Sequence, residues 1–321
     1  MDTFAVSRYA FSVGVAAALL AGCGGWQPLG LPGVTGDDSD SLAHHHTFKY
    51  TGAKQSFIVP AGVTRITVVA RGAAGSGAFG SPYCDPDPDC FGRGGRVYAE
   101  IPVKPREKLY VYVGGRGTPK AGGFNGGGDS GYTYTWPGNG GGGASDVREG
   151  GDALKDRVLV AAGGGGQGGL GSDTNPYYRS YGGNGGGEDG GKGGSPFGGG
   201  GGGGSQTEGG AGGAEGSGSG SGPPGQPGSD GALGLGGNGG TGAKASGSGN
   251  SGGAGGGGGG GYYGGGGGAG GGASIKGYYG SGAGGGGGGG SSWAERRAKH
   301  FRTWSGWKSA KGNGLVVFSW K

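Results

Sequence analysis

Apolar and polar residues alternate in several short segments after residue 46. An alternation of period two is typical of β-strands that bury one face. We expect such strands at 47–50, 55–59, 63–71, 96–103, 108–113, 157–161 and 314–321. Turn-forming stretches such as Pro60-Ala61-Gly62 lie between them. This pattern predicts a mainly β protein built as an antiparallel sandwich. We expect the last strand to pair back into it, because an isolated strand cannot bury its aromatic face.

The pattern disappears between the last two of these strands. Glycine makes up more than half of residues 163–290, and the 321-residue chain contains 104 glycines. Two outcomes are open for this block. It is disordered, because glycine loses the most entropy on ordering and has no side chain to bury, or it forms a bundle of polyglycine, polyproline-II-type helices. Such helices lack internal hydrogen bonds, so each must bond to its neighbours. The flanking sandwich would supply the folded base.

A collagen-like stretch lies inside this block. Glycine occurs at every third position from Gly222 to Gly240, with Pro223, Pro224 and Pro227 between the first repeats. The run is too short and too poor in proline to hold a triple helix. It suits a single polyproline-II strand at the edge of the bundle.

Composition limits the rest of the chain. Apolar residues make up only 31%, which allows one modest core, and the single Met and few Leu residues argue against a helical bundle. We therefore divide the chain into a signal peptide (1–22), a flexible tether (23–46), a β-sandwich (47–162), a glycine-rich block (163–292), a basic aromatic helix or loop (293–311) and a closing strand (312–321).

The N-terminus indicates export and lipidation. One cation precedes an apolar run from Tyr9 to Leu20, which is too short to span a membrane comfortably and ends in Leu20-Ala21-Gly22-Cys23. This sequence resembles the bacterial lipobox, in which the cysteine is lipidated and becomes the mature N-terminus. The alternative is an ordinary secretory signal. Residue 24 is Gly rather than Asp, which implies the outer membrane or cell surface if the source has two membranes.

Two cysteines remain after Cys23, and we expect Cys84 and Cys90 to form a disulfide in an oxidising compartment. They enclose three acidic residues, Asp85, Asp87 and Asp89. These carboxylates offer an alternative Ca²⁺ site, although the twelve-residue calcium-loop pattern is absent. The triplet His44-His45-His46 offers transition-metal ligands, but adjacent residues in an extended chain point in different directions. We therefore interpret the triplet as polar linker.

Positive charge is concentrated near the C-terminus. Residues 293–311 contain six basic residues and one acidic residue, and this net charge of +5 equals that of the whole chain. Ser292 and Glu295 form a capping box, which predicts a short helix from Trp293 towards Trp304. The helix either packs on the sandwich with its cations solvated or binds an anionic envelope polymer. The candidate binding residues are Arg296, Arg297, Lys299, Arg302, Trp304 and Trp307.

Tyrosine pairs interrupt the glycine-rich sequence at Tyr177-Tyr178, Tyr262-Tyr263 and Tyr278-Tyr279. Paired tyrosines at loop tips offer rigid amphipathic surface to a sugar or a protein. They serve equally well as caps that shield the backbone at the ends of a bundle. Both interpretations are open.

Four stretches resemble the glycine-rich domain family: the strand around Phe57 to Thr64, Gly141-Gly142-Gly143-Ala144-Ser145-Asp146-Val147-Arg148, the stretch 158–166 and the stretch 312–317. This family includes part of the ectodomains of the anaplastic lymphoma kinase and leukocyte tyrosine kinase receptors, and many bacterial surface proteins. The resemblance spans 47–321. It implies a jelly-roll-like β-sandwich with an inserted bundle of polyglycine helices. In the receptors this region binds activating ligands, but no matched residue carries that role over, and the kinase signatures are absent.

These observations favour a lipid-anchored, glycine-rich structural, adhesive or ligand-binding module of the bacterial cell envelope, without catalysis. The first alternative is a mainly disordered glycine-rich spacer, and a less favoured one is an envelope enzyme. The stretch Gly75 to Gly80 fits a dinucleotide-binding pattern, but no helix follows it. No cofactor is expected apart from the alternative Ca²⁺ ion. The expected partners are the membrane, through the lipid, and an envelope polymer, glycan or surface protein; nucleic acid is not expected.

Overall fold

The computed structural model describes residues 44–78, 89–173, 175, 180–194, 197–218, 222–247, 249–275 and 280–321. All of them belong to one compact unit, Ser41–Lys321. Within these residues the protein is mainly β, and its only helical element is the 3₁₀ turn η1 (Leu154–Asp156). No helix in the described part is long and apolar enough to cross a membrane.

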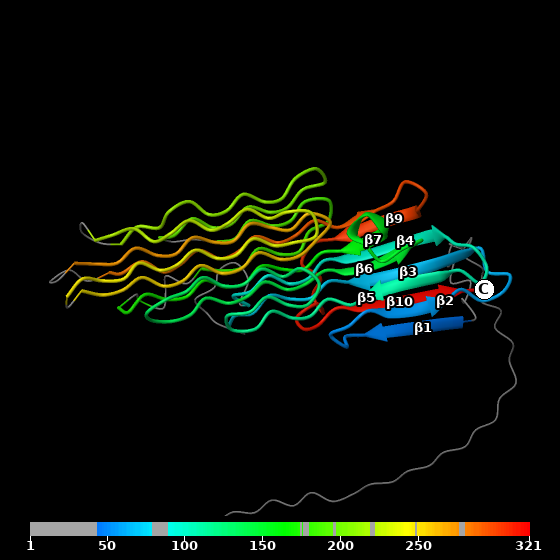
Figure 1. The fold of residues 1–321 in the computed structure, drawn as a ribbon, viewed down its shortest axis with the longest axis horizontal. Helices are drawn as coiled ribbons and strands as arrows, with labels where there is room; N and C mark the ends of the chain where they lie inside the picture. Colours follow the sequence, from blue (N-terminus) through cyan, green and yellow to red (C-terminus); the bar gives the residue numbers. More distant parts are fainter. Residues whose placement is uncertain are drawn as a thin grey trace, which may run out of the picture. The chain divides into compact units, whose positions relative to one another are not determined.

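Ten strands form two antiparallel sheets (Figure 1). The first sheet has the order β1 (His44–Lys49), β10 (Leu315–Trp320), β3 (Arg65–Arg71), β4 (Arg96–Pro102) and β9 (Lys299–Trp304). The second sheet has the order β2 (Gln55–Ile58), β5 (Lys108–Tyr112), β6 (Ser145–Glu149), β7 (Arg157–Ala161) and β8 (Trp293–Ala294). The expected mainly β, antiparallel fold is confirmed.

A single hydrophobic core draws on both sheets, as in a β-sandwich. The alternating positions of β3 and β4 bury Ile66, Val68, Val97 and Ala99 completely, while the intervening residues stay partly exposed. The second sheet contributes four buried side chains to this core: Leu109, Val111, Val147 and Leu159. Each buried aliphatic side chain of this size stabilises the fold by about 1.5–3 kcal/mol, so this core is the base for the longer connections.

The C-terminal strand joins the first sheet as expected. β10 lies between β1 and β3, with Phe318 opposite both His46 and Val68. The prediction that His44, His45 and His46 belong to a linker is wrong. They begin β1, where His44 stacks on Trp320 and His46 contacts Phe48 and Phe57. Backbone pairing with β10 and contacts with aromatic rings stabilise these three residues as a strand, although their side chains are polar.

The predicted helix from Trp293 to Trp304 is also wrong. The segment instead forms β8, a turn and β9, and it passes from the second sheet to the first. Ser292 is not a helix cap: its hydroxyl donates to the Gly186 carbonyl oxygen and accepts from the Ala162 amide. The open edge of β4 provides backbone partners for residues 299–304, and this pairing overrides the local capping signal.

The connections β3–β4, β5–β6 and β7–β8 leave the sheets at the same end and continue as long extended segments (Figure 1). They are joined to one another by backbone hydrogen bonds. Gly142 donates to Gly164, Gly128 to Gly258 and Gly92 to Gly165. The glycine-rich segments therefore include parts of 72–95 and 114–143 as well as the block after residue 162.

The hydrogen bonds of the glycine-rich segments repeat every three residues. Along 253–259, the amides of Gly253, Gly256 and Gly259 donate to the carbonyls of residues 282, 285 and 288. The amides of Gly252, Gly255 and Gly258 donate to a second segment at residues 243, 240 and 237, and Gly257 and Gly260 donate to a third at 139 and 142. Successive amides thus point to different neighbours.

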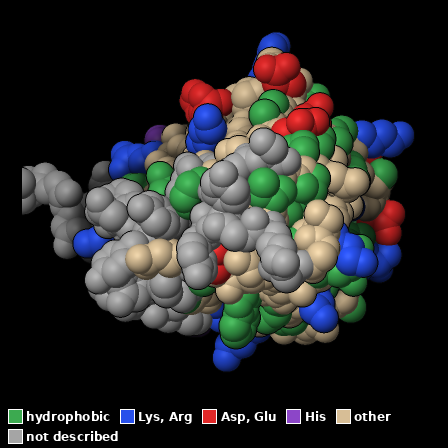
Figure 2. All heavy atoms as spheres, turned by 90° about the vertical axis from the view of Figure 1, so that its left-hand side faces the viewer, with side chains coloured by type: hydrophobic (Ala, Val, Ile, Leu, Met, Phe, Trp, Pro, Cys, Tyr) green, Lys and Arg blue, Asp and Glu red, His purple; other side chains and the backbone are tan. Residues whose placement is uncertain are grey.

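The segment 282–290 shows how completely such a chain is surrounded. Its amides donate to 163–169, 191–194 and 266–272, and its carbonyls accept from 183–186, 201–204 and 253–259. It therefore has six neighbouring segments, and its residues are buried. Charged side chains lie around the margin of the view onto this end of the molecule (Figure 2).

The collagen-like run lies at the outside of these segments, as the triplet spacing predicts. Gly225, Gly228 and Gly231 turn inward and donate to residues 216, 213 and 210, whereas the residues between them are exposed. The run is divided by a tight turn at Gly234, which has a φ of 82°. A left-handed φ of this kind strains residues with a side chain, so glycine is required there.

Close packing of the backbone predicts a strong effect of a single side chain. A Cβ at Gly258 would overlap the carbonyl of Gly265, which is held in place by its own hydrogen bonds. We expect Gly258→Val to separate the segments and to lower the free energy of unfolding by about 1–3 kcal/mol or more. Thermal melting and amide hydrogen exchange check this. Gly312→Val is the control, because a Cβ at Gly312 has no neighbour within 4 Å. Equal melting of the two variants would contradict the prediction.

Candidate functional site

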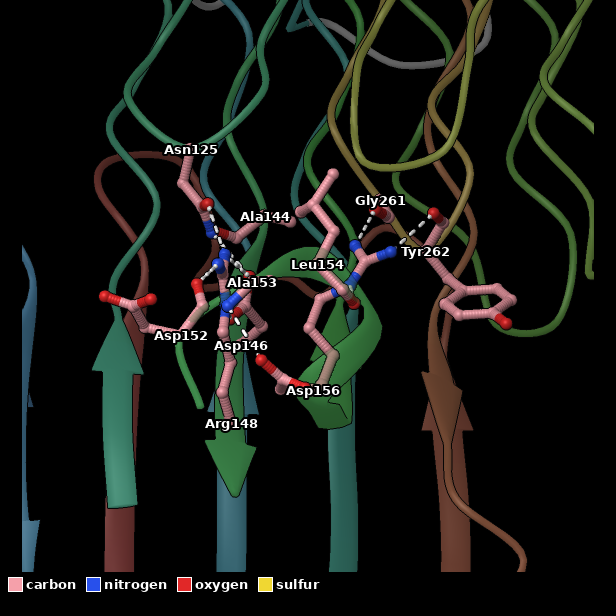
Figure 3. Close-up of polar contacts among 11 residues, drawn as sticks. Asn125, Ala144, Asp146, Arg148, Asp152, Ala153, Leu154, Asp156, Gly261 and Tyr262 are labelled. Atoms are coloured by element: carbon pink, nitrogen blue, oxygen red, sulfur yellow. Dashed lines mark hydrogen bonds and ion pairs between the residues drawn. The ribbon is translucent and has the colours of Figure 1, made fainter. Parts of the chain in front are cut away.

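The junction between the second sheet and the glycine-rich segments holds a buried ion pair (Figure 3). Arg148 donates to both carboxylate oxygens of Asp146 at 2.7 and 3.1 Å, and the side chains of Arg148 and Asp146 are only 6% and 1% exposed. The Arg148 guanidinium lies 3.8 Å from the centre of the Tyr112 ring. Asn125 donates to Asp146 at 2.8 Å and to the Ala144 carbonyl at 2.7 Å. The pair thus ties β6 to the loop that carries Asn125.

A second arginine binds the end of a glycine-rich segment (Figure 3). Arg157 of β7 donates to the carbonyl oxygens of Leu154, Gly261 and Tyr262 at 2.9, 2.9 and 3.1 Å. Burial lowers the pKa of its guanidinium below the ordinary value, although nearby Asp146 acts in the opposite direction. The side chain supplies the donor to the buried Gly261 carbonyl and a second donor to the Tyr262 carbonyl, which also accepts from the Gly234 amide, where the chain turns back towards the sheet.

The Tyr262-Tyr263 pair belongs to this junction. Tyr262 stacks on Trp293 with ring centres 4.6 Å apart and contacts Tyr263 edge to face at 5.3 Å. Both tyrosines are half-buried. This geometry agrees with the capping interpretation for this pair. The other two pairs, Tyr177-Tyr178 and Tyr278-Tyr279, lie outside the described residues.

The basic residues near the C-terminus lie on and beside β9, the edge strand of the first sheet. Arg296, Lys299, Arg302 and Lys308 are exposed and make no ion pair within the described part. Arg297 differs, because it contacts Glu149 at 2.7 Å and Glu295 at 2.8 Å. Hydrogen bonds to these carboxylates raise the pKa of Arg297 above its ordinary value. Cations on an open edge also discourage pairing with a second sheet, which is a structural role.

Two tryptophans beside β9 enclose an arginine. The Arg96 guanidinium lies 4.4 Å from the ring centre of Trp304 and 4.8 Å from that of Trp307. Burial, and secondarily the charge of Arg71, lower the pKa of Arg96. The structure therefore places the predicted cations and the two tryptophans close together on and beside β9. Arg96 already contacts a face of each tryptophan ring, so less of each ring is open to a ligand.

Of the acidic loop, only Asp89 lies in the described residues; Asp85, Asp87 and Cys84 lie outside them, as does Cys23. Asp89 is 4% exposed and contacts Arg93 at 2.9 Å and Lys311 at 2.7 Å. Burial raises the pKa of its carboxyl, but hydrogen bonds from Lys311 and Arg93 outweigh this and hold the pKa below the ordinary value. Two cations thus already neutralise this candidate Ca²⁺ ligand. Among the described residues no group of three His, Cys, Asp or Glu could hold a metal.

Cys90 is fully buried, next to the glycine-rich segments. The Cys90 amide donates to the Ala78 carbonyl oxygen, and the Cys90 carbonyl oxygen accepts from the Gly182 amide. The disulfide with Cys84 stays a prediction.

Sequence reasoning overlooked the loop 131–137. Tyr132, Tyr134 and Trp136 are 63%, 52% and 65% exposed, while Thr133 and Thr135 between them are partly buried. The signal was present as the alternation Tyr-Thr-Tyr-Thr-Trp, which places three aromatic side chains on one side of a short segment. Large exposed rings grouped in this way mark surfaces that contact other molecules.

No family model and no curated protein matches the chain.

The role of Arg157 is testable. We expect Arg157→Met to lower the free energy of unfolding by about 1–3 kcal/mol, because it leaves the buried Gly261 carbonyl without a donor and removes one of the two donors to the Tyr262 carbonyl. Denaturant unfolding checks the magnitude, and hydrogen exchange should show faster opening around residues 261–263. Lys155→Met is the matched control, since Lys155 is exposed on η1. A loss no larger than that of the control would contradict the role.

Proposed function

We propose that this protein is a lipid-anchored structural and ligand-binding module of the bacterial cell envelope. In this proposal a jelly-roll-like sandwich carries a rigid bundle of polyglycine helices. The observation that supports it best is the three-residue period of the hydrogen bonds between glycine-rich segments. A chain with three residues per turn and no internal hydrogen bonds directs successive amides to three different neighbours, which is the geometry of a polyproline-II-type helix.

The position of glycine supports the same interpretation. At Gly258, Gly265 and Gly288 a Cβ would overlap the carbonyl of a neighbouring segment. Inside the segments the described side chains are therefore mostly small, such as Ala254, Ala269 and Ala283, and the prolines and polar residues of 222–232 lie on the outer face. A bundle of this kind is stiff, because bending it would break many backbone hydrogen bonds at once. A stiff projection suits a protein that holds a binding surface away from its anchor, rather than a disordered spacer.

The resemblance to the glycine-rich domain family agrees with this architecture. Its most specific element ends in Ser145-Asp146-Val147-Arg148, and here Ser145 donates to the Arg71 carbonyl at 2.7 Å while Arg148 binds Asp146. Ser145 thus joins β6 to the end of β3, and Asp146 and Arg148 both bind Asn125 in the glycine-rich part of 114–143. The motif is thus explained by a structural role.

In this proposal the group of cations on and beside β9, called the basic edge, contacts the envelope. Arg296, Lys299, Arg302 and Lys308 form a group of exposed cations that suits an anionic polymer or membrane surface. Arg297 is left out of this group, because Glu149 and Glu295 already neutralise it.

The anchor is tested first. We expect Cys23→Ser to abolish lipid attachment and to release the protein from the membrane fraction, because the lipobox cysteine is the acceptor of the lipid. Metabolic labelling with a palmitate analogue, followed by fractionation, measures both. Lys49→Ser, at an exposed position of β1, is the control for a neutral substitution. Labelling of the Cys23→Ser protein at the level of the wild type would contradict lipidation.

The basic edge is tested separately on the mature protein without lipid. Replacement of Arg296, Lys299, Arg302 and Lys308 by Ser should weaken binding to anionic liposomes and isolated cell wall more than tenfold at low salt. Each cation near an anionic surface contributes about 1 kcal/mol. Co-sedimentation at two salt concentrations measures this. A variant with Ser at Lys49, Lys104, Lys155 and Lys192 undergoes the same charge change on other elements. Equal retention of both variants would reduce the edge to a structural feature.

A further inference from the structure

The loop 131–137 is held firmly on the glycine-rich segments. The Gly131 amide donates to the Gly255 carbonyl, and the Tyr132 carbonyl accepts from the Gly242 amide, at 2.9 Å each. The Thr133 hydroxyl donates to the Gly252 carbonyl at 3.0 Å, and the Thr135 hydroxyl donates to the Leu170 carbonyl at 3.2 Å. The threonines therefore fix the backbone from beneath and leave the aromatic side chains on the outer side.

Each of the three aromatic side chains borders a different surface hollow. Tyr132 borders one of about 360 Å³, Tyr134 one of about 240 Å³ and Trp136 one of about 320 Å³. The hollows beside Tyr132 and Trp136 adjoin at Pro137, whereas the hollow beside Tyr134 is otherwise lined by residues of 223–226 and 241–244. Two of them lie within the usual size of small-ligand sites, about 300–1,000 Å³. Three hollows bordered by one short loop suit a ligand that is made of several similar units.

The polar groups around these hollows are hydroxyls, amides and ammonium groups. Ser130, Thr133 and Lys120 line the first, and Gln226, Thr241 and Lys244 line the second. Asn139 and Gln167 line the third. Among the described residues that line them there is no carboxylate. Asp129, which precedes the loop, accepts a hydrogen bond from the Gly122 amide at 2.8 Å.

We propose that this surface, formed by Tyr132, Tyr134 and Trp136 with Lys120 and Lys244, binds an extended acidic polysaccharide. A sugar ring has an apolar face of C–H groups, which carry partial positive charge and pack on the negative face of an aromatic ring. Its hydroxyl groups need the donors and acceptors that surround each hollow. Carboxylates on the sugar units complement Lys120 and Lys244, so the charges and the stacking surfaces select the same class of ligand.

A protein partner fits this surface less well. Protein-binding sites centre on apolar pockets that are sealed from water by surrounding contacts. Here the side chains between the rings are the hydroxyls of Thr133 and Thr135, and the ammonium groups of Lys120 and Lys244 line the adjoining hollows. The site is distinct from the basic edge at β9 and does not require the lipid anchor.

Calorimetric titration of the mature protein with a hexamer of galacturonic acid tests the proposal, with uncharged maltohexaose as the second probe. We expect saturable binding of the acidic hexamer, weakened by raising the salt from about 0.05 to 0.5 M. Trp136→Ala and Tyr132→Ala should each lower the affinity about three- to tenfold for both hexamers. Lys120→Gln with Lys244→Gln should lower the affinity for the acidic hexamer to that for maltohexaose.

Matched controls separate this site from the rest of the surface. Phe301→Ala removes another exposed aromatic ring, and Lys155→Gln with Lys192→Gln removes two other exposed cations. Neither should change the affinity. Thermal melting verifies that each variant is folded, and the two aromatic variants are independent of each other.

Three outcomes would overturn the proposal. The first is no saturable binding of the acidic hexamer by the wild type. The second is unchanged affinity in both folded aromatic variants. The third is loss of binding in the variant with Ser at Arg296, Lys299, Arg302 and Lys308 but not in the aromatic variants, because the hexamer would then bind the basic edge. That last result would leave the proposed envelope-binding role intact while removing this site.

Discussion

Backbone hydrogen bonding between neighbouring chains is the constraint on which most of this structure depends. The interior of the glycine-rich segments has almost no apolar side chains, so burial of hydrocarbon cannot hold it together. Its amides and carbonyls instead find partners on adjacent segments, and an unpaired one would cost about 1–3 kcal/mol. At most inward positions a Cβ would overlap a carbonyl of a neighbouring segment. The glycine content follows from this geometry, because almost every inward position must be glycine.

The sandwich, in contrast, is held together by burial of apolar side chains. Its core of Val, Ile, Leu and Phe side chains provides cooperative stability that an array of glycine chains lacks. The two parts meet where extended chains leave the sheets, and unpaired carbonyls and charges are concentrated there. Arg157 and the Arg148–Asp146 pair satisfy them. Such a buried pair is weak evidence for net stability, but the loss of one partner leaves the other uncompensated.

Much of the sandwich could be predicted from the sequence, because alternation in β3, β4 and β10 reports directly which side is buried. The inward glycines of 222–231 were predictable for the same reason, since their spacing equals the period of the chain. The predictions for His44–His46 and for the helix after Ser292 failed where a partner distant in sequence decided the outcome. β10 provides the partner of the first, and β4 that of the second.

The candidate sites were less accessible to sequence reasoning. The cations around β9 were recognised, but the neutralisation of Arg297 by Glu149 depends on residues 148 positions apart. The aromatic loop at Tyr132 was missed because its alternation is brief and lies within a segment that was assigned to the sandwich. Only the fold shows that its threonines face the glycine-rich segments and its rings face solvent.

The pairing of β7 with β8 has a consequence for how this protein can change in length. The chain leaves the second sheet after Ala161 and returns at Trp293 on the adjacent strand, so the entire excursion begins and ends at one place. Because the hydrogen bonds repeat every three residues, adding or removing three residues in each of the adjoining segments would keep the same positions facing inward. The reach of the projection is therefore a variable that evolution or an engineer can adjust while the sandwich stays unchanged.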